Sequence, residues 1–164
     1  DGKGGSASTT FTFTVTLPVC AAPAAVLSEP GAGMAPAPQQ WRILVVDDNA
    51  DSAEAMAMVL EANGHQLHTA TSGERAIEIA RQVQPHLVLL DIGLPGISGY
   101  EVARVLRDSA HSRHATLVAL TGYGTSYDRE RAVQAGFDHH LVKPADFARL
   151  YAIIDALPAP PQAA

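Results

Sequence analysis

Four short apolar runs in this chain each end on a residue that can take part in metal or phosphate chemistry. The first run ends at the acidic pair Asp47 and Asp48, and a later one ends at Asp91. Two further runs end at Thr121 and at Lys143. Short apolar runs of this kind are typical of buried strands in a parallel sheet, whose carboxyl ends share one edge. We therefore expect these five side chains to converge, although they lie far apart in the sequence.

Their chemistry indicates phosphoryl transfer. Three carboxylates at one place repel one another unless a cation joins them, and Lys143 supplies only one positive charge. The candidate ligands are oxygen donors without a Cys or a Glu-x-x-His pattern among them, so Mg²⁺ is the cation that fits best. An ionised Asp91 beside Mg²⁺, a Lys and the Thr121 hydroxyl is suited to phosphoryl transfer, in which positioning and charge neutralisation provide most of the catalysis.

The elements that must hold these residues are predicted from apolar periodicity. Strands are predicted at residues 43–46, 66–70, 86–91, 116–120 and 139–142. Helices are predicted between and after them, around residues 53–60, 76–83, 100–107, 127–135 and 147–154. Five strands that alternate with five helices favour right-handed crossovers and an α/β fold with a doubly wound parallel sheet.

Capping residues predict where some of these helices begin and end. Gly64 offers a left-handed stop to the first helix. Thr71, followed by Glu74, forms a predicted capping box for the second. In the third helix, Val102 and Val105 are expected to face the core.

The composition narrows the function classes. With 164 residues, 47% of them hydrophobic, the chain can form one domain of ordinary size with tails. A net charge of -6 without a basic stripe argues against a nucleic-acid partner. No apolar run approaches the ~20 residues that span a bilayer, so we expect no direct membrane contact from this part of the chain. The single Cys20 fits a reducing compartment, and we expect a cytoplasmic location.

The first 40 residues differ from the rest. Residues 11–17 alternate apolar residues with threonine, which predicts a strand. With the Gly-rich turn before it and Leu-Pro at its end, the 1–19 stretch resembles the closing strand of the ATP-binding domain of sensor histidine kinases; a stray β-prone tail is the alternative. Residues 20–40 are rich in Ala, Pro and Gly and predict a linker. Residues 158–164 are expected to be a disordered tail.

Several motifs stand in register at successive strand ends. They are Asp47-Asp48, Asp91 with Pro95 and Gly99 at four-residue steps, Thr121-Gly122, and Lys143-Pro144. Together they make residues 41–157 resemble the receiver domain of two-component response regulators. The resemblance implies a flavodoxin-like fold with strand order 2-1-3-4-5.

The resemblance also implies roles for the acidic residues. Asp91 is expected to accept a phosphoryl group from a phosphohistidine on a sensor kinase or a histidine phosphotransfer protein. Mg²⁺ is expected on Asp48, Asp91 and the backbone carbonyl of Gly93, with Asp47 acting through water.

Further roles are implied for the last two strand ends. Lys143 is expected to pair with Asp91 and then with the phosphate, Thr121 to bind a phosphate oxygen, and the Lys143-Pro144 bond to be cis. His140 stands three residues before Lys143, where the family more often has Tyr or Phe as a switch residue. Burying a charged imidazole costs desolvation free energy, and the unperturbed pKa of histidine is ~6.5. We therefore expect the switch to need neutral His140 and to weaken below about pH 6; a solvated, passive His140 is the alternative.

Three classes of function remain. The leading one is a phosphoacceptor module, and the kinase-like strand and linker before it resemble the arrangement of a C-terminal receiver in a hybrid sensor histidine kinase. Such a module is no stand-alone enzyme beyond phosphorylating and dephosphorylating itself at Asp91. The second class, a Mg²⁺-dependent aspartyl phosphohydrolase, needs an acid two residues after Asp91, where Gly93 stands. The third is a pseudo-receiver that only binds partners. Gly93, Gly96 and Gly99 are interpreted as turn residues.

Overall fold

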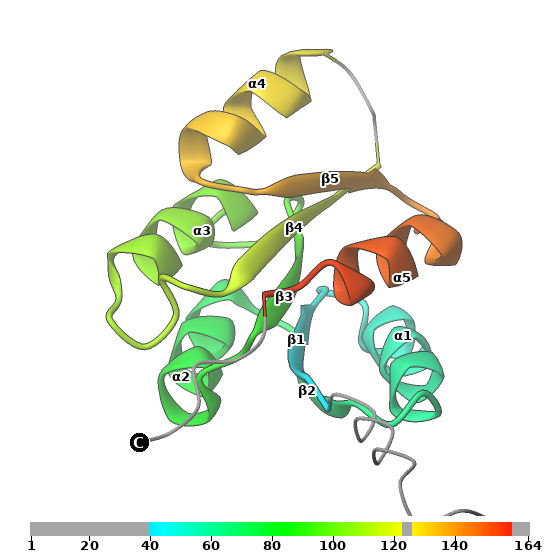
Figure 1. Cartoon of the computed structure of the whole chain (residues 1–164). Helices are drawn as coiled ribbons and strands as arrows, with labels where there is room; N and C mark the ends of the chain where they lie inside the picture. Colours follow the sequence, from blue (N-terminus) through cyan, green and yellow to red (C-terminus); the bar gives the residue numbers. More distant parts are fainter. Residues whose placement is uncertain (1–39, 123–125, 159–164) are drawn as a thin grey trace, which may run out of the picture. The chain divides into compact units, whose positions relative to one another are not determined.

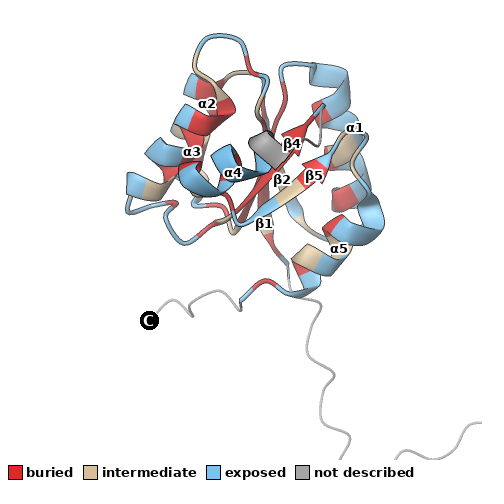
Figure 2. Ribbon diagram, turned by 90° about the horizontal axis from the view of Figure 1, so that it is seen from above, coloured by how far each residue is buried: buried red, intermediate tan, exposed pale blue. Residues whose placement is uncertain are grey.

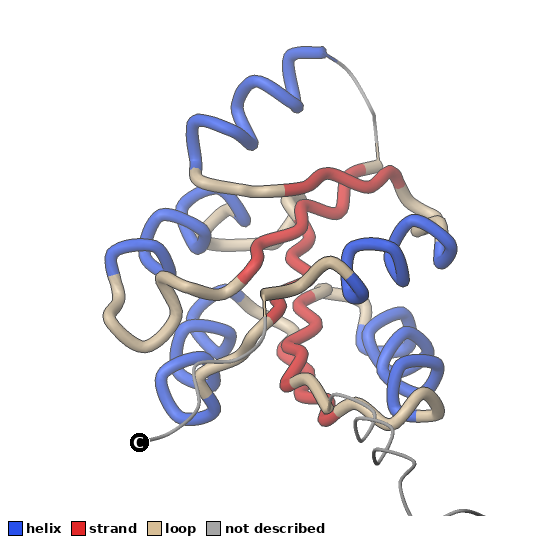
Figure 3. The backbone as a smooth tube through the Cα atoms, in the orientation of Figure 1, coloured by secondary structure: helices blue, strands red, loops and turns tan. Residues whose placement is uncertain are grey.

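The structure is a computed structural model and describes residues 40–122 and 126–158. Its strands are β1 (Arg42–Val46), β2 (Gln66–Ala70), β3 (Leu87–Asp91), β4 (Thr116–Thr121) and β5 (His139–Val142). They form one parallel sheet in the order β2-β1-β3-β4-β5, which runs through the centre of Figure 3. The predicted fold class and strand order are therefore confirmed.

The helices cover both faces of this sheet. They are α1 (Ala50–Glu61), α2 (Gly73–Val83), α3 (Gly99–Asp108), α4 (Ser126–Ala135) and α5 (Phe147–Asp155). Helices α1 and α5 lie on one face, and α2, α3 and α4 lie on the other (Figure 1). Each helix follows a strand, so the crossovers carry the chain back to start the next parallel strand.

Alternate residues of the central strands enter two separate cores. In β3, Leu87 and Leu89 pack on the side of α1 and α5, whereas Val88 and Leu90 pack on the side of α2, α3 and α4. All four are inaccessible to solvent, and full burial of such a side chain contributes about 1.5–3 kcal/mol. Figure 2 shows buried residues in red along the sheet between the helices. This two-sided burial explains why β3 has an unbroken apolar sequence and holds the residue at its end rigidly.

The helix caps correct one prediction. The N-cap of α2 is Ser72, whose side chain accepts the backbone N–H of Arg75. The capping box predicted for Thr71 is wrong, because the helix begins one residue later than that box requires. A complete capping box occurs instead at α3, where Ser98 and Glu101 satisfy each other's backbone N–H groups.

Helix α3 corrects a second prediction. Val102, Ala103 and Leu106 are buried, but Val105 is 39% exposed. The buried stripe follows the i, i+3, i+4, i+7 spacing from the first residue of the helix, and Val105 lies at its margin.

The prediction for the end of α1 is confirmed. Gly64 has the left-handed backbone (φ +87°) that a stop after α1 requires.

Some predictions concern residues outside the described part. The kinase-like strand of residues 1–19 lies outside it, as do residues 20–39 of the linker and 159–164 of the tail. Within residues 40–122 and 126–158, no helix is long and apolar enough to cross a membrane.

Candidate functional site

Three carboxylates meet at the carboxyl ends of β1 and β3. Asp47 and Asp48 directly follow β1, and Asp91 is the last residue of β3. Because Val46 pairs with Leu90 in the sheet, the next residues of the two strands are neighbours. One carboxylate oxygen from each of the three acids lies within 4.8 Å of the others. Asp47 and Asp91 are buried and Asp48 is exposed, so the cluster is open to solvent on the side of Asp48.

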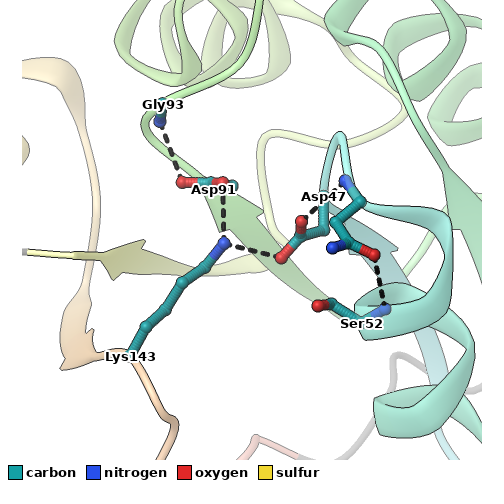
Figure 4. Close-up of polar contacts among 6 residues, drawn as sticks. Asp47, Ser52, Asp91, Gly93 and Lys143 are labelled. Carbon is teal, nitrogen blue, oxygen red and sulfur yellow. Dashed lines mark hydrogen bonds and ion pairs between the residues drawn. The ribbon is translucent and has the colours of Figure 1, made fainter.

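Lys143 joins two of these carboxylates. Its Nζ lies 2.6 Å from Oδ2 of Asp47 and 2.7 Å from Oδ2 of Asp91 (Figure 4). Partial burial lowers the pKa of Lys143, but its hydrogen bonds to Asp47 and Asp91 and their charges outweigh this effect and raise the pKa above its usual value. The ammonium is therefore charged at neutral pH. The Lys143-Pro144 peptide bond is cis, the isomer expected from the sequence.

Backbone N–H groups fix the other oxygens of the same carboxylates. Oδ1 of Asp91 accepts the N–H of Gly93 at 2.8 Å, and Oδ1 of Asp47 accepts the N–H of Asn49 at 3.0 Å. Asn49 in turn caps α1, because its side-chain Oδ1 accepts the N–H of Ser52. Asp47 is thus not the helix cap: its Oδ1 is held by the Asn49 N–H, and its Oδ2 binds Lys143.

Thr121 and His140 form a second polar contact beside this cluster. Thr121 ends β4, the neighbour of β3, and its side chain is buried. Its Oγ1 lies 2.8 Å from Nε2 of His140, on the adjacent strand β5. The Thr121 hydroxyl is therefore hydrogen-bonded to the imidazole in this conformation, and the tautomer of His140 decides which of the two groups donates.

The donor set fits a divalent cation. Three carboxylates and one ammonium leave a formal excess of two negative charges in a small, partly buried space. All candidate ligands are hard oxygen donors, which suit Mg²⁺ with several waters kept on the open side. The residues present could thus hold Mg²⁺ beside Asp91.

The structure brings together four of the predicted site residues, Asp47, Asp48, Asp91 and Lys143. It also joins the two predicted switch residues to each other. Asn49 was missed, although an Asn directly before a helical pattern is an N-cap signal that could have identified it. The contact between Thr121 and His140 has no such signal, because it depends on the pairing of two strands.

Comparison with known proteins decides the family. Residues 43–155 match the sequence profile of the response regulator receiver domain. The chain belongs to this family. The polar-differentiation response regulator DivK of Brucella ovis is 34% identical over 107 residues, which are 65% of this chain and 87% of DivK.

Two solved structures add chemical context for this receiver domain. The receiver domain of the sensor histidine kinase PA1611 of Pseudomonas aeruginosa, solved with a magnesium ion in its active site cleft, is 28% identical, with a TM-score of 0.66 over 73% of this chain and 98% of that one. A chain from the co-crystal of the Saccharomyces cerevisiae histidine phosphotransfer protein Ypd1 with the receiver domain of Ssk1 is 25% identical, with a TM-score of 0.66 over 72% of this chain and 88% of that one.

Proposed function

We propose that this receiver domain accepts a phosphoryl group on Asp91 from a phosphohistidine. The observation that carries the proposal is the position of Asp91, buried at the end of the central strand with Oδ2 on Lys143 and Oδ1 on the N–H of Gly93. In the reaction an Asp91 oxygen attacks phosphorus, the P–N bond breaks, and its electron pair returns to the donor imidazole. The product is an aspartyl phosphate.

Mg²⁺ is part of this proposal. The Asp48 and Asp91 carboxylates and the Gly93 carbonyl would hold the ion, with Asp47 acting through a bound water. Bound there, it would neutralise charge on the phosphoryl oxygens. The acidic cluster and the magnesium ion of the PA1611 receiver domain support this assignment.

Lys143, Thr121 and His140 complete the proposed mechanism. Lys143 neutralises Asp91 before transfer and pairs with the phosphoryl group afterwards. Thr121 donates its hydroxyl proton to a phosphoryl oxygen, and its contact with His140 is lost as the side chain turns toward the phosphoryl group. The imidazole then moves inward, which makes Thr121 and His140 the switch that reports phosphorylation to the surface of β5.

The proposed donor is a phosphohistidine domain, either of a sensor kinase or of a histidine phosphotransfer protein. The co-crystal of Ypd1 with the Ssk1 receiver domain supports this kind of partner. We further propose that the chain is the receiver of a hybrid sensor histidine kinase, as the PA1611 receiver belongs to a sensor histidine kinase. The reaction would then take place in the cytoplasm, where ATP supplies the phosphohistidine.

The geometry favours this function over its two alternatives. A pseudo-receiver has no need for an intact set of three acids and a paired Lys, all of which are present here. An aspartyl phosphohydrolase would place an acid at position 93, which is Gly93.

The proposal is tested by incubating the protein with acetyl phosphate and Mg²⁺ and recording the intact mass. We expect one added phosphoryl group, none with EDTA, and none in the Asp91→Asn variant, whose side chain keeps the shape of Asp91 but is a poor nucleophile. A wild-type protein that binds Mg²⁺ but gains no mass would favour the pseudo-receiver, and a gain in the Asn variant would place the site elsewhere.

A further inference from the structure

Gly99, the first residue of α3, lies against the backbone of the phosphoacceptor. A Cβ placed on Gly99 would be 2.3 Å from the carbonyl oxygen of Asp91, 2.8 Å from Cα of Ile92 and 3.0 Å from the carbonyl carbon of Asp91. Its φ is not in the left-handed region, whereas Gly96 has φ +81°. The predicted turn role is therefore wrong for Gly99 and fits Gly96. What Gly99 provides is a close approach of helix to strand.

Neither side of this contact can move away easily. On the strand side, Asp91 is paired with Leu120 in β4, and Ile92 donates its N–H to the carbonyl of Leu120 at 3.1 Å. On the helix side, the capping box fixes the first turn of α3, and Tyr100 and Val102 are buried in the core. The two sides are joined by a hydrogen bond of 3.2 Å from Gly99 N–H to the carbonyl of Ile92. The three atoms nearest to a new methyl group are all backbone, so no rotamer change could relieve the clash with them.

We propose that Gly99 is a positioning residue for Asp91: its missing side chain lets α3 begin against the Asp91 peptide and so sets the place of the carboxylate relative to Lys143 and the other acids. The effect of Gly99 on the position of the Asp91 carboxylate does not depend on what the site does, whereas its effect on phosphorylation rests on the function proposed above. A methyl group at this position must push the Asp91 peptide and α3 apart. Because the Asp91 carboxylate is held by short bonds to Lys143 and to the Gly93 N–H, even a small displacement alters its reactive geometry.

Gly73 offers a matched control. It is the first residue of α2 and, like Gly99, directly follows a serine N-cap. A Cβ on Gly73 would come within 2.6 Å of side-chain atoms of Ile97 and Val102, but of no backbone atom of the site. Ile97 can rotate to make room, whereas the buried Val102 must shift within the core, so Gly73→Ala strains the packing between α2 and α3 without touching the Asp91 backbone. Gly73→Ala and Gly99→Ala therefore share helix position and chemistry and differ in whether the Asp91 backbone is displaced.

The experiment compares the wild type, Gly99→Ala and Gly73→Ala at a temperature where circular dichroism shows each to be folded. The initial rate of phosphorylation by acetyl phosphate and the Mg²⁺ affinity from NMR shifts are measured. Since a misplacement of about 1 Å can cost roughly 100-fold in rate, we expect a loss of at least tenfold for Gly99→Ala and less than about twofold for Gly73→Ala. A folded Gly99→Ala protein with wild-type rate and affinity would overturn the proposal.

Two further measurements separate this proposal from the proposed function. If the wild type accepts no phosphoryl group, the proposed function fails. A crystal structure of Gly99→Ala then tests separately whether Gly99 positions the Asp91 carboxylate. The Lys143 Nζ to Asp91 Oδ2 distance should exceed its 2.7 Å; an unchanged distance with a displaced α3 would overturn the role. If Gly99→Ala does not fold, Mg²⁺ titration of the wild type decides: the Gly99 amide should shift along the same saturation curve as Gly93, and a Gly99 amide that does not respond would contradict the coupling.

Discussion

Lys143→Met removes the ammonium from the carboxylate cluster and keeps most of the apolar stem. Among residues 40–122 and 126–158, Lys143 forms the ion pairs to Asp47 and Asp91, whose side chains are only 6% and 11% exposed. Removing one partner of a buried ion pair typically costs 3–5 kcal/mol, because the other charge stays buried without compensation. The Lys143 side chain is 32% exposed, so water screens part of the interaction and we expect a loss of about 2–3 kcal/mol in the free energy of unfolding at pH 7.

The pKa of Lys143 gives this contribution a pH dependence. Because the folded protein raises that pKa above 10.5, the stabilising effect is complete below pH 10.5 and fades as the pH rises through the folded-state value. At pH 7 the full loss should therefore be visible in the variant.

Mg²⁺ should reverse most of this loss. The variant keeps all three acids and lacks the cation that competes for two of them, so it should bind Mg²⁺ more tightly than the wild type. Ligand binding to the folded state alone stabilises it by mass action. In urea denaturation with EDTA we expect the variant to be weaker, and with saturating Mg²⁺ the difference should shrink.

A double variant provides the control for this reasoning. In an Asp47→Asn background one of the two carboxylates is already neutral, so adding Lys143→Met should cost clearly less than it does in the wild type. Equal stability of Lys143→Met and wild type in EDTA, or an equal stabilisation of both by Mg²⁺, would refute the electrostatic account.

Three other predictions address separate parts of the structure. Asp48→Ala should weaken Mg²⁺ binding at least tenfold, roughly 1.4 kcal/mol, from the loss of an anionic ligand; unchanged affinity in an NMR titration would move the metal elsewhere. Burial and the charge of Arg42 lower the pKa of His86, and its Nδ1 accepts the backbone N–H of Arg42. The neutral imidazole therefore stabilises the fold above pH 6.5, and this stabilisation is lost as the pH falls below 6.5. The free energy of unfolding should change by at most about 1.4 kcal/mol per pH unit from this group. The pKa of His65 is also lowered, so the contribution of His86 must be isolated by comparing wild type with His86→Phe. The free energy of unfolding of both proteins is measured by urea denaturation over pH 5–8. The same pH dependence in both proteins would contradict this prediction. The NMR shifts that beryllofluoride induces should shrink below about pH 6 in the wild type but not in His140→Phe; pH-independent wild-type shifts would exclude the switch role of that imidazole.

The sequence was sufficient for much of the fold. The strands were found because a strand buried on both faces has a continuous apolar run, as from Leu87 to Leu90. The acidic cluster followed from the shared edge of parallel strands, without any knowledge of side-chain contacts. Element boundaries were less certain: Thr71 and Ser72 are both good N-cap residues, and only the backbone of α2 decides between them.

What the sequence could not reveal depends on contacts between distant residues. The imidazole of His86 receives the Arg42 N–H and packs edge-on against Trp41, although nothing in their spacing indicates this. Gly99 was interpreted as a turn residue because the absence of a side chain has several uses, and a close approach between two backbones is visible only in three dimensions. The bond between Thr121 and His140 likewise needs the register of β4 and β5.

The central claim is that the phosphoryl group is carried by Asp91 itself, and chemical trapping tests it most directly. Protein treated with acetyl phosphate and Mg²⁺ is reduced with borohydride, which converts an aspartyl phosphate into homoserine, and is then sequenced by tandem mass spectrometry. We expect homoserine at position 91 and unmodified aspartate at positions 47 and 48, because of these three acids Asp91 alone combines a buried strand end with contacts to both Lys143 and the Gly93 N–H. Homoserine at position 47 or 48, or none at position 91 in protein that has gained the phosphoryl mass, would contradict the account.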